Sequence, residues 1–140
     1  MRQPVHGTVV ALRCKGQWRG VMICGPSGAG KSDLALRLMT MGARLVVDDQ
    51  AIVWAHNGCI YARAPQTISG KIEVRGVGIL PASPLAFVRV SLIVQAQLET
   101  PERLPDQQFT ELEGVRVPSM GLRLLHPSAP HVVASALEAL

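Results

Sequence analysis

The chain alternates short apolar runs with glycine, proline and charged residues, which predicts several strands and few helices. Runs rich in valine, leucine and isoleucine are typical of buried strands, and four occur: 5–12, 21–24, 44–47 and 87–98. Two other segments, 31–42 and 130–140, repeat apolar residues at helical spacing and are predicted to be helices. Gly42 suits the left-handed position that follows a helix.

Two short connections indicate antiparallel strand pairs. Residues 51–55 and 59–63 flank His56-Asn57-Gly58, and an Asn-Gly pair is typical of a hairpin turn. Residues 15–20 join the first two strands, and a parallel crossover would need about a dozen residues or more. We therefore predict an α/β fold with a mixed β-sheet, in one domain that accounts for residues 1–140.

Three segments between these elements carry weaker patterns. Residues 65–84 mix glycines, prolines and polar side chains, and we predict an irregular, partly mobile segment there. Residues 100–108 form a polar, proline-bearing loop, and residues 112–118 are predicted to be another short strand. The long apolar run at 87–98 is predicted to be a central strand of the sheet.

The segment between the second strand and the first helix has the phosphate-binding (Walker A, or P-loop) pattern G-x-x-x-x-G-K-[ST]. Its eight residues are Gly25-Pro26-Ser27-Gly28-Ala29-Gly30-Lys31-Ser32. Such a loop between strand and helix turns its N–H groups toward anionic oxygens. Lys31 would then reach the terminal phosphates and the Ser32 hydroxyl would hold a magnesium ion. The pattern predicts binding of a nucleotide or similar polyphosphate; the alternative is a glycine-rich turn that binds nothing.

Two adjacent carboxylates follow the predicted strand at 44–47. Asp48 and Asp49 lie one helix and one strand after Ser32, a spacing that returns the chain beside the phosphate loop. A carboxylate there can orient magnesium or accept a proton from an attacking hydroxyl. Because adjacent residues on an extended chain point to opposite faces, only one is expected to be the base. The alternative is a turn with two solvated aspartates.

Other polar residues are more ambiguous. Asp33 either interacts favourably with the positive N-terminal end of the helix dipole or serves as an outer-shell group for the metal. His6 either tunes a nearby acid or is an ordinary strand histidine; its claim rests on its strand pairing with the one that delivers the loop. Glu73 and Arg75 lie two residues apart on an extended segment. They could supply a magnesium ligand and a phosphate clamp, or form an internal ion pair.

Composition narrows the class of protein. The chain is 48% hydrophobic and 17% charged, as expected for a compact globule. Its net charge of +4 suits an anionic ligand, but the charges are scattered and the five aromatic residues do not alternate with basic ones, so we expect no nucleic-acid partner. No apolar run reaches the length of a membrane span and no leader is apparent. We expect a cytoplasmic protein without a membrane partner, with its three cysteines as free thiols.

Four stretches together resemble the catalytic, C-terminal domain of HPr kinase/phosphorylase. They are Val5-His6-Gly7, the run GPSGAGKSDLAL from Gly25, Arg44-Leu45-Val46-Val47-Asp48-Asp49, and Ile72-Glu73-Val74-Arg75-Gly76-Val77-Gly78-Ile79. The resemblance is specific over roughly the first 80 residues and implies the mixed-sheet catalytic fold of that family. It implies an enzyme that uses ATP and Mg²⁺ to phosphorylate a serine of the phosphocarrier HPr or a related carrier. In many members the same site removes that phosphate by phosphorolysis, and long members form hexamers, so the resemblance implies a homo-oligomer.

The resemblance also implies residue roles. Lys31 and Ser32 match the phosphate-loop lysine and a magnesium ligand, and Asp49 matches the base that activates the serine. His6 matches a histidine that assists this base, and Glu73 matches a second magnesium ligand. We include Asp48 among the metal-site candidates. For a further active-site arginine, Arg103 is the better match and Arg89 the weaker one.

The chain departs from the family pattern in two places, and one whole domain of longer family members has no counterpart in it. The family more often has glutamate where Asp33 stands, and residues 115–124 lack the usual pattern near the substrate. The N-terminal domain of longer members is not matched, so we expect a short, catalytic-domain-only form. The leading hypothesis is a protein-serine kinase of HPr; the alternatives are a small-molecule P-loop kinase and a non-catalytic nucleotide-binding sensor.

Overall fold

The computed structural model describes residues 4–65, 71–74, 76–81 and 84–140. Its two helices are α1 (Lys31–Thr40) and α2 (Ala129–Glu138). Its strands are β1 (Val5–His6), β2 (Thr8–Cys14), β3 (Gln17–Cys24), β4 (Arg44–Val47), β5 (Gln50–His56), β6 (Cys59–Arg63), β7 (Lys71–Val74), β8 (Gly78–Pro81), β9 (Phe87–Ala96), β10 (Gln108–Leu112) and β11 (Val115–Leu122).

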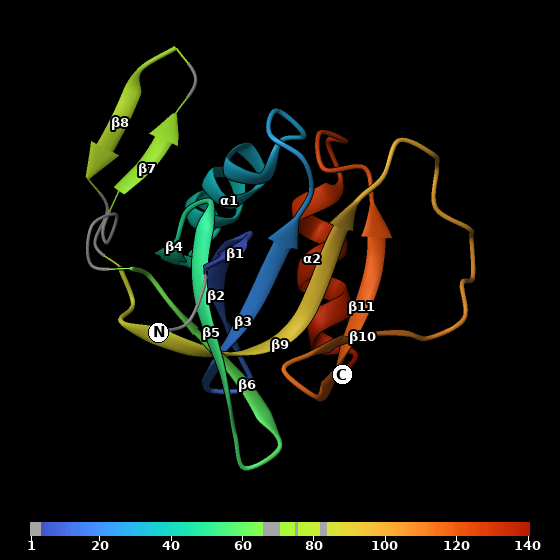
Figure 1. Cartoon of the computed structure of the whole chain (residues 1–140). Coiled ribbons are helices and arrows are strands. Elements are labelled where there is room, and N and C mark those ends of the chain that lie inside the picture. Colours follow the sequence, from blue (N-terminus) through green and yellow to red (C-terminus); the bar gives the residue numbers. More distant parts are fainter. Residues whose placement is uncertain (1–3, 66–70, 75, 82–83) are drawn as a thin grey trace.

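One curled, mixed sheet contains all strands except the separate β7–β8 hairpin (Figure 1). Its main path runs β1-β5-β6-β9-β3-β2-β4, and β11 adds to β9 with β10 beyond it. The long strand β9 is central, as predicted: it pairs with β6 antiparallel and with β3 and β11 parallel. The prediction of an α/β fold with a mixed sheet is therefore confirmed.

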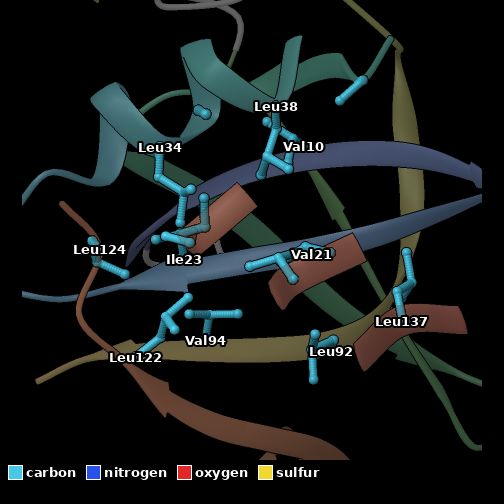
Figure 2. Packing of buried hydrophobic residues seen from close by; sticks show 14 of the residues in the cluster. Val10, Val21, Ile23, Leu34, Leu38, Leu92, Val94, Leu122, Leu124 and Leu137 are labelled. Carbon is cyan, nitrogen blue, oxygen red and sulfur yellow. The ribbon is translucent and has the colours of Figure 1, made fainter. Parts of the chain in front are cut away.

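Hydrophobic packing covers both faces of the sheet. Both helices lie on one face of β2, β3 and β9 (Figure 1), where Leu34 and Leu38 of α1 contact the strand side chains (Figure 2). Figure 2 also shows Leu137 of α2 beside β9. On the other face a second cluster includes Val53 of β5 and Ile60 of β6 together with residues of β2, β3 and β9. The sheet must curl for β5 and β6 to reach that cluster.

Several boundary predictions are confirmed. The strand at 44–47, the hairpin of β5 and β6, and the antiparallel pairing of β2 with β3 all occur. Asn57 and Gly58 take φ values of 51° and 74°, the left-handed geometry of a tight hairpin turn. Helix α1 ends two residues before Gly42, whose φ of 103° is also left-handed.

Other boundary predictions were wrong, and each has a local cause. The strand predicted over 5–12 is broken at Gly7 into β1 and β2, which have different partners. The turn predicted at 15–20 is shorter, because β3 already begins at Gln17. The strand predicted over 112–118 contains the turn between β10 and β11, where Glu113 and Gly114 take φ values of 50° and 76°.

Within the segment predicted to be irregular, the described residues 71–74 and 76–81 belong to the β7–β8 hairpin, which extends away from the sheet in Figure 1. Ile72 is 3% exposed and Val74 packs against the same cluster, so one face of β7 packs against the helix-bearing face of the sheet. Val77 and Ile79 near its tip are 66% and 71% exposed. Residues 66–70 and Arg75 lie outside the described residues, so the clamp role considered for Arg75 has no structural account.

Candidate active site

The phosphate loop and the paired aspartates meet because of the strand order. Strand β2 is antiparallel to both β3 and β4, so β3 and β4 point the same way and end at the same edge of the sheet. The loop follows β3 there, and Asp48 and Asp49 follow β4. Ligands of open α/β sheets bind at such carboxyl ends. The predicted return of the aspartates to the phosphate loop is what the structure shows.

The loop has the backbone shape that its sequence predicts. Gly28 and Gly30 have φ values of 83° and 105°, which side chains with a Cβ rarely adopt. A Cβ on Gly30 would also lie 2.7 Å from Cδ2 of Leu125, so the side chain of Leu125 would have to shift. Helix α1 begins at Lys31, directly after this turn, and places its N-terminal end against the loop.

Lys31 is held inside the site. Its side chain is 5% exposed, and its Nζ donates to the carbonyl oxygens of Gly25 at 2.8 Å and Pro26 at 3.1 Å. The same Nζ lies 4.0 Å from Oδ1 of Asp49. A buried ammonium needs such partners, because a buried charge without hydrogen bonds is unfavourable. The positive charge is thereby kept at the point where the loop opens.

Asp48 connects three elements through hydrogen bonds. Its Oδ1 accepts from the hydroxyls of Ser32 at 2.7 Å and Thr8 at 3.0 Å. Its Oδ2 accepts from the backbone N–H of Glu73 at 3.1 Å. Both carboxylate oxygens therefore have partners, and Asp48 fixes the Ser32 hydroxyl that the motif assigns to magnesium.

Asp49 faces the mouth of the loop. Its Oδ1 lies 2.6 Å from Nε2 of His6, and 55% of its side chain is exposed. Its φ of 74° is unusual for a residue with a side chain, a strain that is often found at functional sites. His6 reaches Asp49 because β1 pairs with β5, with His6 opposite Gln50. The expectation that the strand of His6 pairs with the loop-bearing strand was wrong; the break at Gly7 redirects it.

Thr8 is a site residue that the sequence did not single out. It is fully buried, donates to Asp48, and its Oγ1 accepts from the backbone N–H of Asp49 at 3.3 Å. It begins β2, the strand between the two that end at the site. One signal was available: a polar side chain in an otherwise apolar buried strand needs a hydrogen-bond partner.

A cavity of about 210 Å³ lies over these residues. It is lined by Ser27, Gly28, Gly30, Lys31, Ser32, Asp33, Leu36, Asp49, Glu73 and Val74. Drug-sized ligands occupy pockets of about 300 Å³ or more, so this cavity fits the phosphate end of a nucleotide rather than a whole one. Asp33 lies at its edge and pairs with Arg37, with Nε 2.9 Å from Oδ2.

The two arginine candidates do not reach this cavity. Arg89 lies six residues along β9 from Gln95, which pairs with Cys24 at the base of the loop. At about 3.3 Å per residue, it lies about 20 Å from that end of the strand. Arg103 is exposed on the segment between β9 and β10, and it is not among the cavity-lining residues.

The residues fit a site for magnesium and nucleotide phosphates. Magnesium is usually held by one or two side chains together with substrate phosphates and water, rather than by a protein cage. In the described part of the chain, no group of three or more His, Cys, Asp or Glu side chains could hold a metal. Ser32, Glu73 and Asp48 remain the predicted metal-site residues, and the turn with Lys31 the predicted phosphate site.

Cys24 lies beneath the loop as the last residue of β3. Burial raises the pKa of its thiol above 9.0, and the nearby Lys31 charge partly opposes this. All three cysteines, Cys14, Cys24 and Cys59, are free, as predicted.

Comparison with known proteins identifies a protein family and a solved structure that are similar to this chain. The family described as HPr Serine kinase C-terminal domain matches residues 1–136. The structure titled Hpr(Ser) kinase/phosphatase from Coxiella burnetii is similar, with a TM-score of 0.79 and 22% identity over 99% of this chain and 95% of that one. In the part of the chain that the structure describes, no helix has the length and apolar character needed to span a membrane.

Proteins named HPr kinase/phosphorylase are similar in sequence. The one from Limosilactobacillus reuteri is 35% identical over 134 residues, which cover 86% of this chain and 41% of that protein. The one from Geobacillus thermodenitrificans is 33% identical over 135 residues, which cover 90% and 42%. A third, from Clostridium kluyveri, is 47% identical over 66 residues, 47% of this chain and 21% of that protein. The chain thus spans about two-fifths of the first two relatives, and the match over residues 1–136 shows that it belongs to the family of HPr serine kinase C-terminal domains.

Proposed function

We propose that this chain is an ATP- and Mg²⁺-dependent kinase that phosphorylates a serine of HPr or a related phosphocarrier protein. The observation that carries the proposal is the contact of Asp49 with His6 and Lys31 at the mouth of the phosphate loop. A carboxylate beside a phosphate site and open to solvent can reach a hydroxyl on another protein. The names of the relatives supply the identity of that protein.

The phosphate loop and its neighbours would hold the nucleotide. The loop N–H groups and Lys31 would bind the phosphates, and Ser32, Glu73 and Asp48 form the magnesium side of the site. Bound Mg·ATP would supply the phosphoryl group and offset the negative charge that develops on it. Asp48 keeps the Ser32 hydroxyl in place through the 2.7 Å hydrogen bond before any ligand arrives.

Asp49 is the proposed general base. His6 and Lys31 both approach its Oδ1, and no hydrogen bond to its Oδ2 comes from the described residues. That oxygen is therefore available to accept the proton of a serine hydroxyl. The imidazole of His6 orients the carboxylate, and Thr8 fixes its backbone through the N–H. Proton removal by a placed carboxylate contributes about 10²–10⁴-fold to such reactions.

The same carboxyl group suits the reverse reaction, phosphorolysis. Inorganic phosphate would attack the phosphorus of phosphoserine, and the serine oxygen would leave with the proton of Asp49. The products are then pyrophosphate and the unmodified carrier. We propose this as a second activity, since the relatives are named for both reactions. We also propose that residues 1–140 form one cytoplasmic catalytic domain that assembles as a homo-oligomer.

The test is a direct transfer assay. Purified chain, ATP, Mg²⁺ and an HPr-type carrier are incubated, and phosphoserine on the carrier is measured by mass spectrometry. A carrier with the target serine changed to alanine is the control. Phosphorylated carrier is then supplied with inorganic phosphate in the absence of ATP, and pyrophosphate is measured.

Each outcome of this assay has one meaning. Phosphoserine on the carrier supports the kinase, and pyrophosphate supports the second activity. Phosphate on a small metabolite instead of any carrier would replace the proposal with a small-molecule kinase. Binding of ATP with no transfer to either acceptor would indicate a nucleotide sensor.

A further inference from the structure

A second cavity, of about 160 Å³, lies at the opposite end of the central strands from the phosphate loop. It forms where β9 changes neighbours along one edge: β6 pairs with residues 87–89, and β11 pairs with residues 93–96. The two ladders leave a gap beside Val90 and Ser91, both of which line the cavity. The cavity therefore results from the topology of the sheet, not from a loose surface loop.

Three arginines from three different strands line this cavity: Arg19 of β3, Arg89 of β9 and Arg116 of β11. The register places them at one level, because Gly20 pairs with Val90. Arg116 lies three residues before Ser119, the partner of Ile93, and so reaches the same level. Their strand positions alternate with residues of the second core cluster, so the three side chains leave the same face of the sheet.

None of these three arginines takes part in an ion pair among the described residues, and none donates a side-chain hydrogen bond to them. The Nε of Arg19 is fully buried and unpaired, which is unusual for a guanidinium. Glu111 lies opposite Arg116 across the β10–β11 hairpin, yet the Arg116 guanidinium instead stacks 4.1 Å from the ring centre of Phe109.

A bound dianion would pair with these positive charges. Guanidinium groups bind phosphate and carboxylate oxygens through paired hydrogen bonds. Three of them match the three terminal oxygens of a phosphoryl group better than the two oxygens of a carboxylate. The stacking on Phe109 holds the Arg116 plane in one orientation, so less freedom is lost when a ligand binds.

We infer that this cavity is a binding site for the phosphoryl group of a small molecule, separate from the phosphate loop. Its volume is below the roughly 300 Å³ of drug-sized pockets, which favours inorganic phosphate or the phosphate end of a small metabolite. Arg89 lies about 20 Å along β9 from the loop, so one phosphate cannot contact both sites. The inference does not depend on the proposed kinase activity.

The test must separate this site from the phosphate loop, which also binds phosphate. Lys31→Ala removes the main charge of the loop, and inorganic phosphate is titrated into this variant by calorimetry. The same titration is made after adding Arg89→Ala and Arg116→Ala, both at exposed positions. Arg63→Ala, at an exposed arginine on β6 outside the cavity, is the matched control.

We expect the two cavity substitutions to weaken phosphate binding at least tenfold and Arg63→Ala to leave it unchanged. Equal binding with and without Arg89 and Arg116 would overturn the inference. If Lys31→Ala does not fold, the two substitutions are made in the unaltered chain, where they should remove one of two bound phosphates. If neither bound phosphate is lost, the inference is likewise overturned.

Three probes identify the source of the anion. Tighter binding of glycerol 3-phosphate than of inorganic phosphate would indicate a phosphorylated metabolite, and the opposite order would indicate free phosphate. Succinate carries two negative charges without phosphorus. Binding of succinate as tightly as both phosphates would overturn the assignment to a phosphoryl group.

Discussion

The two ends of the central strands carry opposite electrostatic arrangements. At the carboxyl ends of β3 and β4, Lys31, Asp48 and Asp49 all contact partners of opposite charge or hydrogen-bonding groups. At the other end, Arg19, Arg89 and Arg116 line one cavity and none of them is in an ion pair among the described residues. At the first end the charged side chains are held by protein partners before a ligand arrives. At the second end a bound ligand would supply the negative charge that pairs with the arginines. Substitutions at the two ends should therefore change the protein in opposite directions.

The largest effect is expected at the phosphate-loop end, from Asp49→Asn. Asparagine tolerates the left-handed φ of 74°, so the backbone should remain as it is. We expect phosphoryl transfer to fall by about 10²–10⁴-fold, because the proton acceptor is lost, while ATP affinity is retained. Steady-state kinetics and calorimetry measure the two quantities. Asp106→Asn, at an exposed position between β9 and β10, is the control and should keep full activity; equal activity of both variants would remove Asp49 from its role.

Thr8→Val tests whether the hydrogen bonds of this end hold it together. Valine has nearly the same shape, but Asp48 loses a donor and the Asp49 N–H loses its acceptor. We expect the free energy of unfolding to fall by about 1–3 kcal/mol, as measured by urea denaturation. Ser119→Ala provides the comparison, because Ser119 is the other hydroxyl residue buried in the described part of the chain and makes no side-chain hydrogen bond there. A Thr8 variant as stable as the Ser119 variant would contradict the network.

His6→Gln should have a smaller effect on the reaction. Glutamine can still donate a hydrogen bond to the carboxylate, and the contact of His6 with Asp49 is about half exposed. A hydrogen bond to a charged group is worth about 1.5–3 kcal/mol before solvent screening, so we expect kcat to fall about tenfold. Because the contact is exposed to solvent, the free energy of unfolding should change little. His56→Gln, at the exposed β5–β6 turn, is the matched control. A loss as large as that of Asp49→Asn would instead make His6 the proton acceptor.

The smallest effect, and the only gain, is expected at the arginine end. Arg89→Ala removes one of three like charges, so the free energy of unfolding should rise by about 0.3 kcal/mol at low ionic strength without phosphate. Added salt that does not bind should reduce the gain, because it screens the repulsion. Thermal denaturation of Arg89→Ala and Arg63→Ala measures the difference. A loss of stability specific to Arg89→Ala would show that the arginines are already compensated.

Local patterns predicted the elements nearest the site. Gly25 to Ser32 could be identified because a phosphate loop is built from consecutive residues, and its shape follows from glycines at defined positions. The strand at 44–47 was equally clear, and so were the two aspartates at its end. The β7–β8 hairpin was missed because its glycines and prolines resemble a loop, while burial of Ile72 depends on α1 and distant strands.

Residue contacts across the sheet could not be predicted in the same way. Thr8 bonds to Asp48 and His6 to Asp49, at sequence separations of 40 and 43 residues. Such contacts depend on which strands are neighbours, and nothing in the local pattern indicates that β2 lies between β3 and β4. The resemblance to the kinase family indicated a role for His6. The structural reason predicted for that role, a strand paired with the loop-bearing strand, was wrong.

The sequence by itself therefore predicted a phosphate-binding turn at Gly25 to Ser32 and a carboxylate one helix and one strand away. Tertiary structure alone decided which carboxylate oxygen meets Ser32, which residue orients Asp49, and where three scattered arginines meet. The physical reason is the range of the interactions. Backbone turns and helix starts depend on neighbouring residues, whereas hydrogen bonds and charge clusters depend on strand order and register, which form only when distant segments pack together.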